Sequence, residues 1–153
     1  MKNYTSEVPV TTTIARIEGF LARAGIRNII KDYDDGQVAG LVFTLPNPKN
    51  PTMTTAARLP VDVNAMATVL RRAYSPKRNW TKEAEQRLFD QSRRTAWKLT
   101  QDWVEVQLSL IELGQVEALQ VFLPYLWDGK RTYYARLKAG DFKALPVHFE
   151  EKS

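Results

Sequence analysis

The sequence predicts an α+β fold, with a three-stranded antiparallel meander and flanking helices followed by a long helix and short C-terminal helices. Three observations lead to this fold class. Apolar residues recur at gaps of three and four in both halves of the chain, which is the helical period. Two runs rich in β-branched and aromatic residues flank an Asp-Asp-Gly turn at residues 34–36, which is typical of a β-hairpin. Neither Gly nor Pro occurs between Thr81 and Leu113, so one long helix can form there.

The length of 153 residues is that of a single domain. No internal repeat and no low-complexity tract divides the chain. We expect one α+β domain over residues 1–140, made of a helix–meander–helix half (12–76) and a helical half (77–140). Residues 141–153 lack a periodic pattern and are expected to form a C-terminal tail.

The first half carries the meander. Threonines 11–13 can cap a first helix and Gly25 can end it. Residues 46–54 contain three prolines and must form a loop, so the sequence leaves open whether a third strand follows them. Asp62 or Asn64 can cap the helix that closes this half. The predicted elements are a helix over 14–24, strands over 26–33, 37–45 and 53–61, and a helix over 62–74.

The second half is helical. The 33 residues from Thr81 to Leu113 would form a rod of roughly 50 Å at 1.5 Å rise per residue, which is long for so small a domain. Gly114 ends the rod, and residues 115–123 are expected to form a short return helix. A last helix is predicted over 132–139.

The composition removes the commonest catalytic groups. The chain has no Cys and one His, His148, which excludes disulfides, thiol chemistry and Cys-rich zinc sites. Its seven Gly are scattered without the spacing of a phosphate-binding loop. Asp32, Asp34 and Asp35 are the densest acids, and they fit a hairpin turn better than a magnesium site. We therefore expect no enzyme, no cofactor and no metal site.

Positive charge is concentrated in one segment. The chain carries 22 Lys and Arg against 17 Asp and Glu, with an isoelectric point near 9.5. Residues 71–98 hold nine basic and three acidic residues, so the net charge of this segment, 9 − 3 = +6, is larger than the net charge of +5 of the whole chain. A basic segment of this kind favours a nucleic-acid partner.

The long helix would gather part of this charge on one side. At 100° per residue, Arg87, Arg94 and Lys98 fall within about 40° of one another and about 115° from the centre of the apolar stripe. Such a cationic ridge can contact phosphates, and an indole beside it can stack on an unpaired base. The predicted nucleic-acid-binding residues are Arg71, Arg72, Lys77, Arg78, Trp80, Arg87, Arg94 and Lys98.

A second interpretation of the same residues is a solvated flank. Glu83, Glu85 and Asp90 are close enough in sequence to pair with the arginines. In that case Trp80 would pack as a lid over the core. The sequence leaves both interpretations open.

The long helix also carries apolar residues on the side opposite its first stripe. These residues are Trp97, Val104, Leu108 and Ile111. A helix that is apolar on two sides is normally covered on two sides. The cover is either the rest of this chain or another chain, which would be a homo-oligomer partner or a host protein.

Four stretches resemble a group of uncharacterised small proteins encoded by bacteriophages and prophages: TTTIARIEGFLARAGIRNIIKDYDDG, ARLP, TAWKLTQDWVEVQLSLIELG and FLPYL. The resemblance covers most of the chain and implies a mobile-element setting, in which small proteins often serve DNA replication, recombination or interference with the host. The element order over 12–74 is also similar to that of double-stranded-RNA-binding domains. That family uses a lysine cluster at the start of its last helix, whereas residues 60–67 contain no lysine.

Two functions follow as hypotheses. The first is a non-enzymatic accessory protein of a phage or prophage that binds nucleic-acid phosphates through the cationic ridge. The second is a protein-interaction module that uses the second apolar face of the long helix. The first 13 residues lack the apolar core of a signal peptide, and no stretch of about 18 apolar residues occurs. We therefore expect no membrane contact and a place in the cytoplasm of the bacterial host cell.

Overall fold

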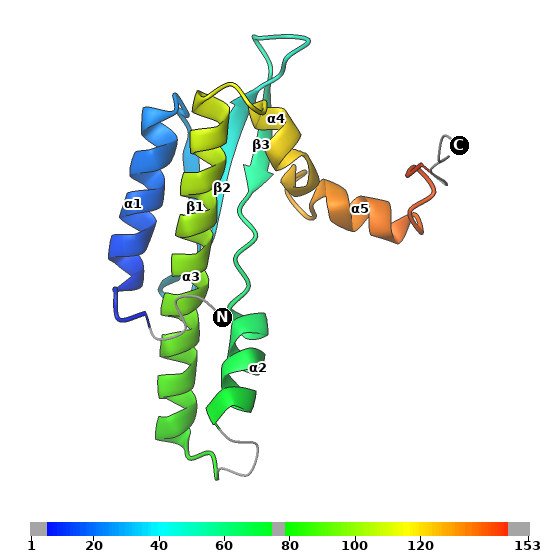
Figure 1. Ribbon diagram of the computed structural model, residues 1–153. Coiled ribbons are helices and arrows are strands. Elements are labelled where there is room, and N and C mark those ends of the chain that lie inside the picture. Colours follow the sequence, from blue (N-terminus) through cyan, green and yellow to red (C-terminus); the bar gives the residue numbers. More distant parts are fainter. Residues whose placement is uncertain (1–5, 75–78, 147–153) are drawn as a thin grey trace, which may run out of the picture.

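The computed structural model describes residues 6–74 and 79–146 and confirms the predicted α+β fold class (Figure 1). A three-stranded antiparallel sheet lies against helices α1 and α3, and α2 lies beside the lower part of α3 (Figure 1). The elements are α1 (Val10–Arg23), β1 (Ile29–Asp34), β2 (Gln37–Pro46), β3 (Thr54–Arg58), α2 (Val63–Tyr74), α3 (Lys82–Glu112), α4 (Ala118–Phe122), the 3-10 turn η1 (Leu123–Tyr125) and α5 (Tyr133–Ala139).

Helix α1 buries the predicted apolar side but starts earlier than predicted. The carbonyl of Pro9 accepts hydrogen bonds from the backbone N–H groups of Thr12 and Thr13, both at 3.1 Å, so these threonines lie inside the helix and do not cap it. Gly25 follows the helix with a φ of 91°, a left-handed conformation that favours glycine. The helix therefore ends where the sequence predicts.

The meander has the strand order β1-β2-β3, which settles the question of the third strand. The hairpin between β1 and β2 turns at Asp35 and Gly36, whose φ angles are 51° and 75°. Two consecutive left-handed residues form the tight turn whose twist matches that of paired strands. The assignment of these acids to turn chemistry is confirmed for Asp34 and Asp35.

Asp32 has a different role from its two neighbours. It lies within β1 and pairs with the guanidinium of Arg58 on β3, on the far side of β2. Gly40 of β2 makes this contact possible, because a Cβ atom there would lie 2.1 Å from Nη2 of Arg58. The guanidinium also lies 4.9 Å from the ring centroid of Trp127, which ties the sheet to the C-terminal segment.

Helix α3 is the shared wall of two hydrophobic clusters. In its first half Leu88 and Ala96 pack with Met66 and Leu70 of α2. In its second half, Trp97 and Val104 join the core residues of α1 and the sheet. The helix starts at a cap, because the side chain of Thr81 accepts the backbone N–H of Ala84 at 3.1 Å.

The second apolar face of α3 proves to be interior. Trp97 and Val104 have no exposed surface, and Leu108 and Ile111 are half-buried against the same cluster. The interpretation of these four residues as a contact with another chain is therefore wrong for Trp97 and Val104. The reason is geometric: α1 and the sheet pack on this side of α3, while α2 takes the other side only along the first half.

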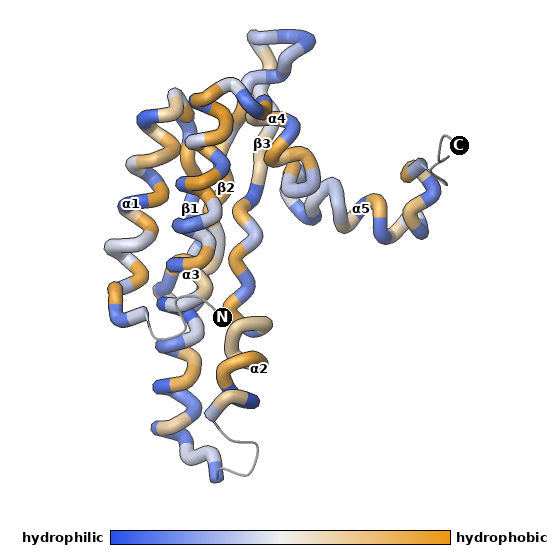
Figure 2. The backbone as a smooth tube through the Cα atoms, viewed as in Figure 1, coloured by the Kyte–Doolittle hydropathy of each residue, from blue (hydrophilic) through white to orange (hydrophobic). Residues whose placement is uncertain are grey.

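The residues after α4 form an arm that projects from the body of the molecule (Figure 1). Its base is held to β3 by a β-bridge between Ala57 and Leu126, and a second bridge, between Trp127 and Thr132, lies within the arm. Helix α5 begins with a cap, in which the Thr132 side chain accepts the backbone N–H of Ala135 at 3.2 Å, and no residue of α5 is buried. Figure 2 shows hydrophobic segments along the arm from α4 through α5.

The two faces of α3 predict different costs of truncation. We expect Trp97→Ala to lower the free energy of unfolding by about 3–5 kcal/mol, because it opens a cavity in the core. Val106→Ala on the opposite side, where the side chain is 56% exposed, should change it by less than about 0.5 kcal/mol. Urea unfolding of both variants measures the difference. Equal losses would contradict the assignment of the buried face.

Candidate nucleic-acid interface

The predicted cationic residues come from two antiparallel helices. Arg71 and Arg72 lie in the last turn of α2, while the other described cations of the ridge lie on α3. Lys77 and Arg78 lie outside the described residues, as does His148. Arg72 and Arg87 are exposed. The structure therefore brings the start of α3 and the end of α2 together at one end of the molecule (Figure 1).

Arg71 is already paired within the chain. Its guanidinium donates two hydrogen bonds to the carboxylate of Glu85, one of them from Nη2 to Oε2 at 2.8 Å, and it lies 4.9 Å from the ring centroid of Trp80. The hydrogen bonds from Arg71 lower the pKa of the Glu85 carboxyl, and they raise the pKa of Arg71. Arg71 is therefore not a free cation, and the pairing interpretation holds at this position.

Lys98 and Arg94 are also held, in different ways. The Lys98 ammonium lies 3.2 Å from the carboxylate of Asp102, one turn further along α3, which compensates its charge. Arg94 donates from Nε to the carbonyl of Ser6 at 3.2 Å and from Nη2 to the side-chain oxygen of Gln91 at 2.8 Å. Both of these partners of Arg94 are neutral, so the guanidinium keeps its charge while its position is fixed.

A hollow of about 280 Å³ collects the remaining aromatic and cationic groups. Trp80, Arg87 and Arg94, which the sequence predicts, line it together with Tyr74 from the end of α2. Tyr74 is 42% exposed. Trp80 is half-buried and packs against the α2–α3 cluster, so it also fits the lid interpretation. Tyr74 is not among the predicted residues. The one signal for it in the sequence is its position, six residues before Trp80 and on the other side of a helix-breaking segment.

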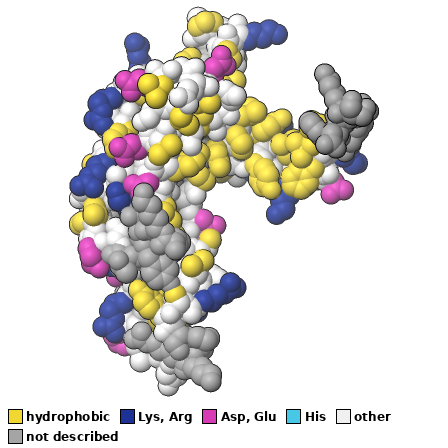
Figure 3. Space-filling view, viewed as in Figure 1, with side chains coloured by type: hydrophobic (Ala, Val, Ile, Leu, Met, Phe, Trp, Pro, Cys, Tyr) yellow, Lys and Arg dark blue, Asp and Glu magenta, His cyan; other side chains and the backbone are white. Residues whose placement is uncertain are grey.

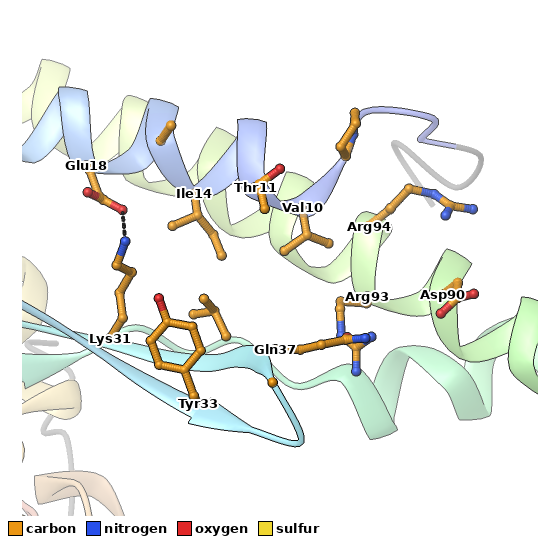
Figure 4. Close-up of a pocket in the computed structure, with 14 residues that line it drawn as sticks. Val10, Thr11, Ile14, Glu18, Lys31, Tyr33, Gln37, Asp90, Arg93 and Arg94 are labelled. Atoms are coloured by element: carbon orange, nitrogen blue, oxygen red, sulfur yellow. Dashed lines mark ion pairs between the residues drawn. The ribbon is translucent and has the colours of Figure 1, made fainter.

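A second, larger hollow of about 640 Å³ lies between α1, the β1–β2 hairpin and α3 (Figure 4). Its apolar wall includes Val10 and Ile14, and Arg93 points across it toward the hairpin (Figure 4). Lys31 is paired with Glu18 at 3.1 Å, and the hydrogen bond to Glu18 raises its pKa.

Arg93 is a cation outside the predicted ridge. Its position lies about 100° from that of Arg94 around α3, on the side that the helical wheel assigns to packing. Arg94 lines both hollows, whereas Arg93 lines only the larger one. The two consecutive arginines therefore place positive charge at the edges of both hollows.

The described part of the chain was also compared with the requirements of a metal site and of a membrane span. Among residues 6–74 and 79–146, no group of three or more acidic, His or Cys side chains is placed to hold a metal ion. Within the same ranges, no helix has the length and apolar character needed to cross a membrane. Comparisons with protein-family models, with curated proteins and with solved structures each gave no match to this chain.

The pair formed by Glu85 and Arg71 predicts a pH-dependent contribution to stability. Because the folded-state pKa of Glu85 is lowered, its contribution is complete above the ordinary carboxyl pKa and is lost as the pH falls through the lowered value. We expect Glu85→Gln to lower the melting temperature at pH 7 and the gap to the parent protein to close in acid. Thermal melts of both proteins from pH 7 down to acid pH test this expectation. The control is Glu105→Gln, which changes an exposed carboxyl on the same helix. A gap that persists in acid would contradict the assignment.

Proposed function

We propose that this protein binds single-stranded nucleic acid without strong sequence preference, as a non-enzymatic accessory protein of a phage or prophage. The observation that carries the proposal is the hollow that Tyr74, Trp80, Arg87 and Arg94 line together. The mobile-element setting rests on the sequence resemblance alone.

Cations and aromatic rings serve two separate parts of a nucleic-acid strand. Guanidinium groups neutralise phosphates and release their counterions, which supplies affinity that falls with salt. Aromatic rings stack on bases that are not paired, and every base offers such a face. A hollow that combines both groups favours a single strand, because the bases of a duplex already stack on one another.

The charge distribution also favours binding at the end of the molecule where the hollow lies. Residues 71–98 carry nine basic and three acidic residues, whereas residues 100–122 carry four acidic residues and no Lys or Arg. A polyanion is therefore attracted to the first half of α3 and repelled by the second half. Pairing with Glu85 and Asp102 lowers the number of available cations, which places the main electrostatic role on Arg87 and Arg94.

Removal of one available cation should weaken binding and reduce its salt dependence. For a labelled oligothymidine, we expect Arg87→Gln to lower the slope of log affinity against log salt by about 0.7, the value for one phosphate contact on a single strand. Fluorescence anisotropy at several salt concentrations gives the slope.

Lys49→Gln is the matched control for this change. It removes the same charge from the exposed β2–β3 loop, at the other end of the molecule from the hollow (Figure 1). We expect its slope to match that of the parent protein. Parent binding that is absent, or that does not respond to salt, would overturn the proposal.

The aromatic part of the hollow predicts discrimination between single and double strands. We expect Tyr74→Ala to weaken binding of the oligothymidine by about 1–3 kcal/mol, the cost of one lost stacking contact. Binding of a duplex of equal length should change much less, because its bases are not free to stack. Tyr33→Ala in β1, where the side chain is 63% exposed, is the control for loss of an exposed tyrosine. Equal effects of Tyr74→Ala on both ligands would argue against a single-strand site.

A further inference from the structure

A stripe of α3 lies uncovered beyond the end of its contact with α2. Val106 and Leu113 are 56% and 71% exposed, and Leu110 between them is half-buried. At 100° per residue, these positions continue the side of α3 that Leu88 and Leu99 present to α2 in the first half. The cover ends because α2 has 12 residues and α3 has 31. We call Val106, Leu110 and Leu113 the open stripe.

The arm, residues 123–146, carries apolar surface of its own. Leu123, Tyr133, Tyr134 and Leu145 are between 38% and 51% exposed. Figure 3 shows hydrophobic side chains gathered along the arm and continuing onto the adjoining body. The main neighbour of α5 within the chain is η1, and a helix of 7 residues is marginal in water without packing of its apolar side.

The arm is basic, and the segment that contains the open stripe is acidic. The arm contains five Lys and Arg and two Asp. The segment that contains the open stripe, residues 100–122, has four acidic residues and no basic one, and Glu105 and Glu112 are exposed within it. Both surfaces are therefore apolar. Glu105 and Glu112 lie about 100° around α3 from the adjoining residues of the open stripe, so the flank beside the stripe is acidic whereas the arm is basic.

From this complementarity we propose that the arm of one copy packs on the open stripe of a second copy, and that two copies exchange arms in a symmetric homodimer. One chain presents both surfaces, and its own arm points away from the body (Figure 1). In a two-fold dimer each surface meets its complement on the other copy, so the contact forms twice and closes. The proposal does not depend on nucleic-acid binding, since Arg87 and Val106 are separated by roughly 28 Å along α3.

Two substitutions test this contact, one in the open stripe and one in the arm. Neither is expected to destabilise the helix in which it lies. Val106→Glu places a charge in the open stripe, and Tyr134→Glu places one in the first turn of α5, where an acid suits the helix dipole. We expect each to raise the dimer dissociation constant about tenfold or more in sedimentation velocity experiments. Ala22→Glu adds the same charge to an exposed position of α1 and should leave the constant unchanged.

Mixing the two variants identifies the arm as the exchanged element. A mixed dimer of Val106→Glu and Tyr134→Glu keeps one intact arm–stripe contact, whereas each variant alone has none. We therefore expect the mixture to associate at concentrations at which either variant is monomeric. A parent protein that remains monomeric at high concentration would overturn the proposal and leave these surfaces to a different partner. A dimer that the variants do not weaken, or a mixture that does not associate, would also overturn it.

Discussion

The structure depends on one helix that serves two cores. Helix α3 has 31 residues, and neither α1 with 14 nor α2 with 12 can cover its length. The chain resolves this mismatch by burying one side of α3 against α2 in the first half and a different side against α1 and the sheet in the second half. Trp97, fully buried next to Ala96 of the other cluster, lies where the buried side changes.

This change of buried side determines which surfaces remain for binding. In the first half, the side of α3 between the two covered faces carries Arg87 and Arg94, and the end of α2 brings Tyr74 beside them. In the second half, the side that α2 would cover is exposed as the open stripe. The cationic hollow and the apolar stripe are therefore two consequences of the same packing arrangement, at opposite ends of one helix.

Local chemistry made the elements predictable from the sequence. The Asp35–Gly36 turn and the glycine after α1 each follow from a residue type with a specific backbone preference. The partners of α3 were not predictable, because a helix with two apolar sides does not specify which neighbour reaches which side. For the same reason, the sequence leaves open whether the rest of the chain or another chain covers Trp97 and Val104, and it does not single out Arg93. The pairing of Arg71 with Glu85 is a contact between helices that only the antiparallel packing of α2 on α3 creates.

The separation of the two surfaces gives the proposed dimer a consequence for nucleic-acid binding. The hollow lies near the start of α3 and the arm follows its end, so a dimer joined through the arms leaves both hollows accessible (Figure 1). Two linked sites on one strand bind with an effective concentration set by their spacing. A strand long enough to reach both hollows therefore gains affinity that a short strand does not. This length dependence distinguishes a dimer with two open hollows from a monomer with one, because a monomer binds each segment of a long strand independently.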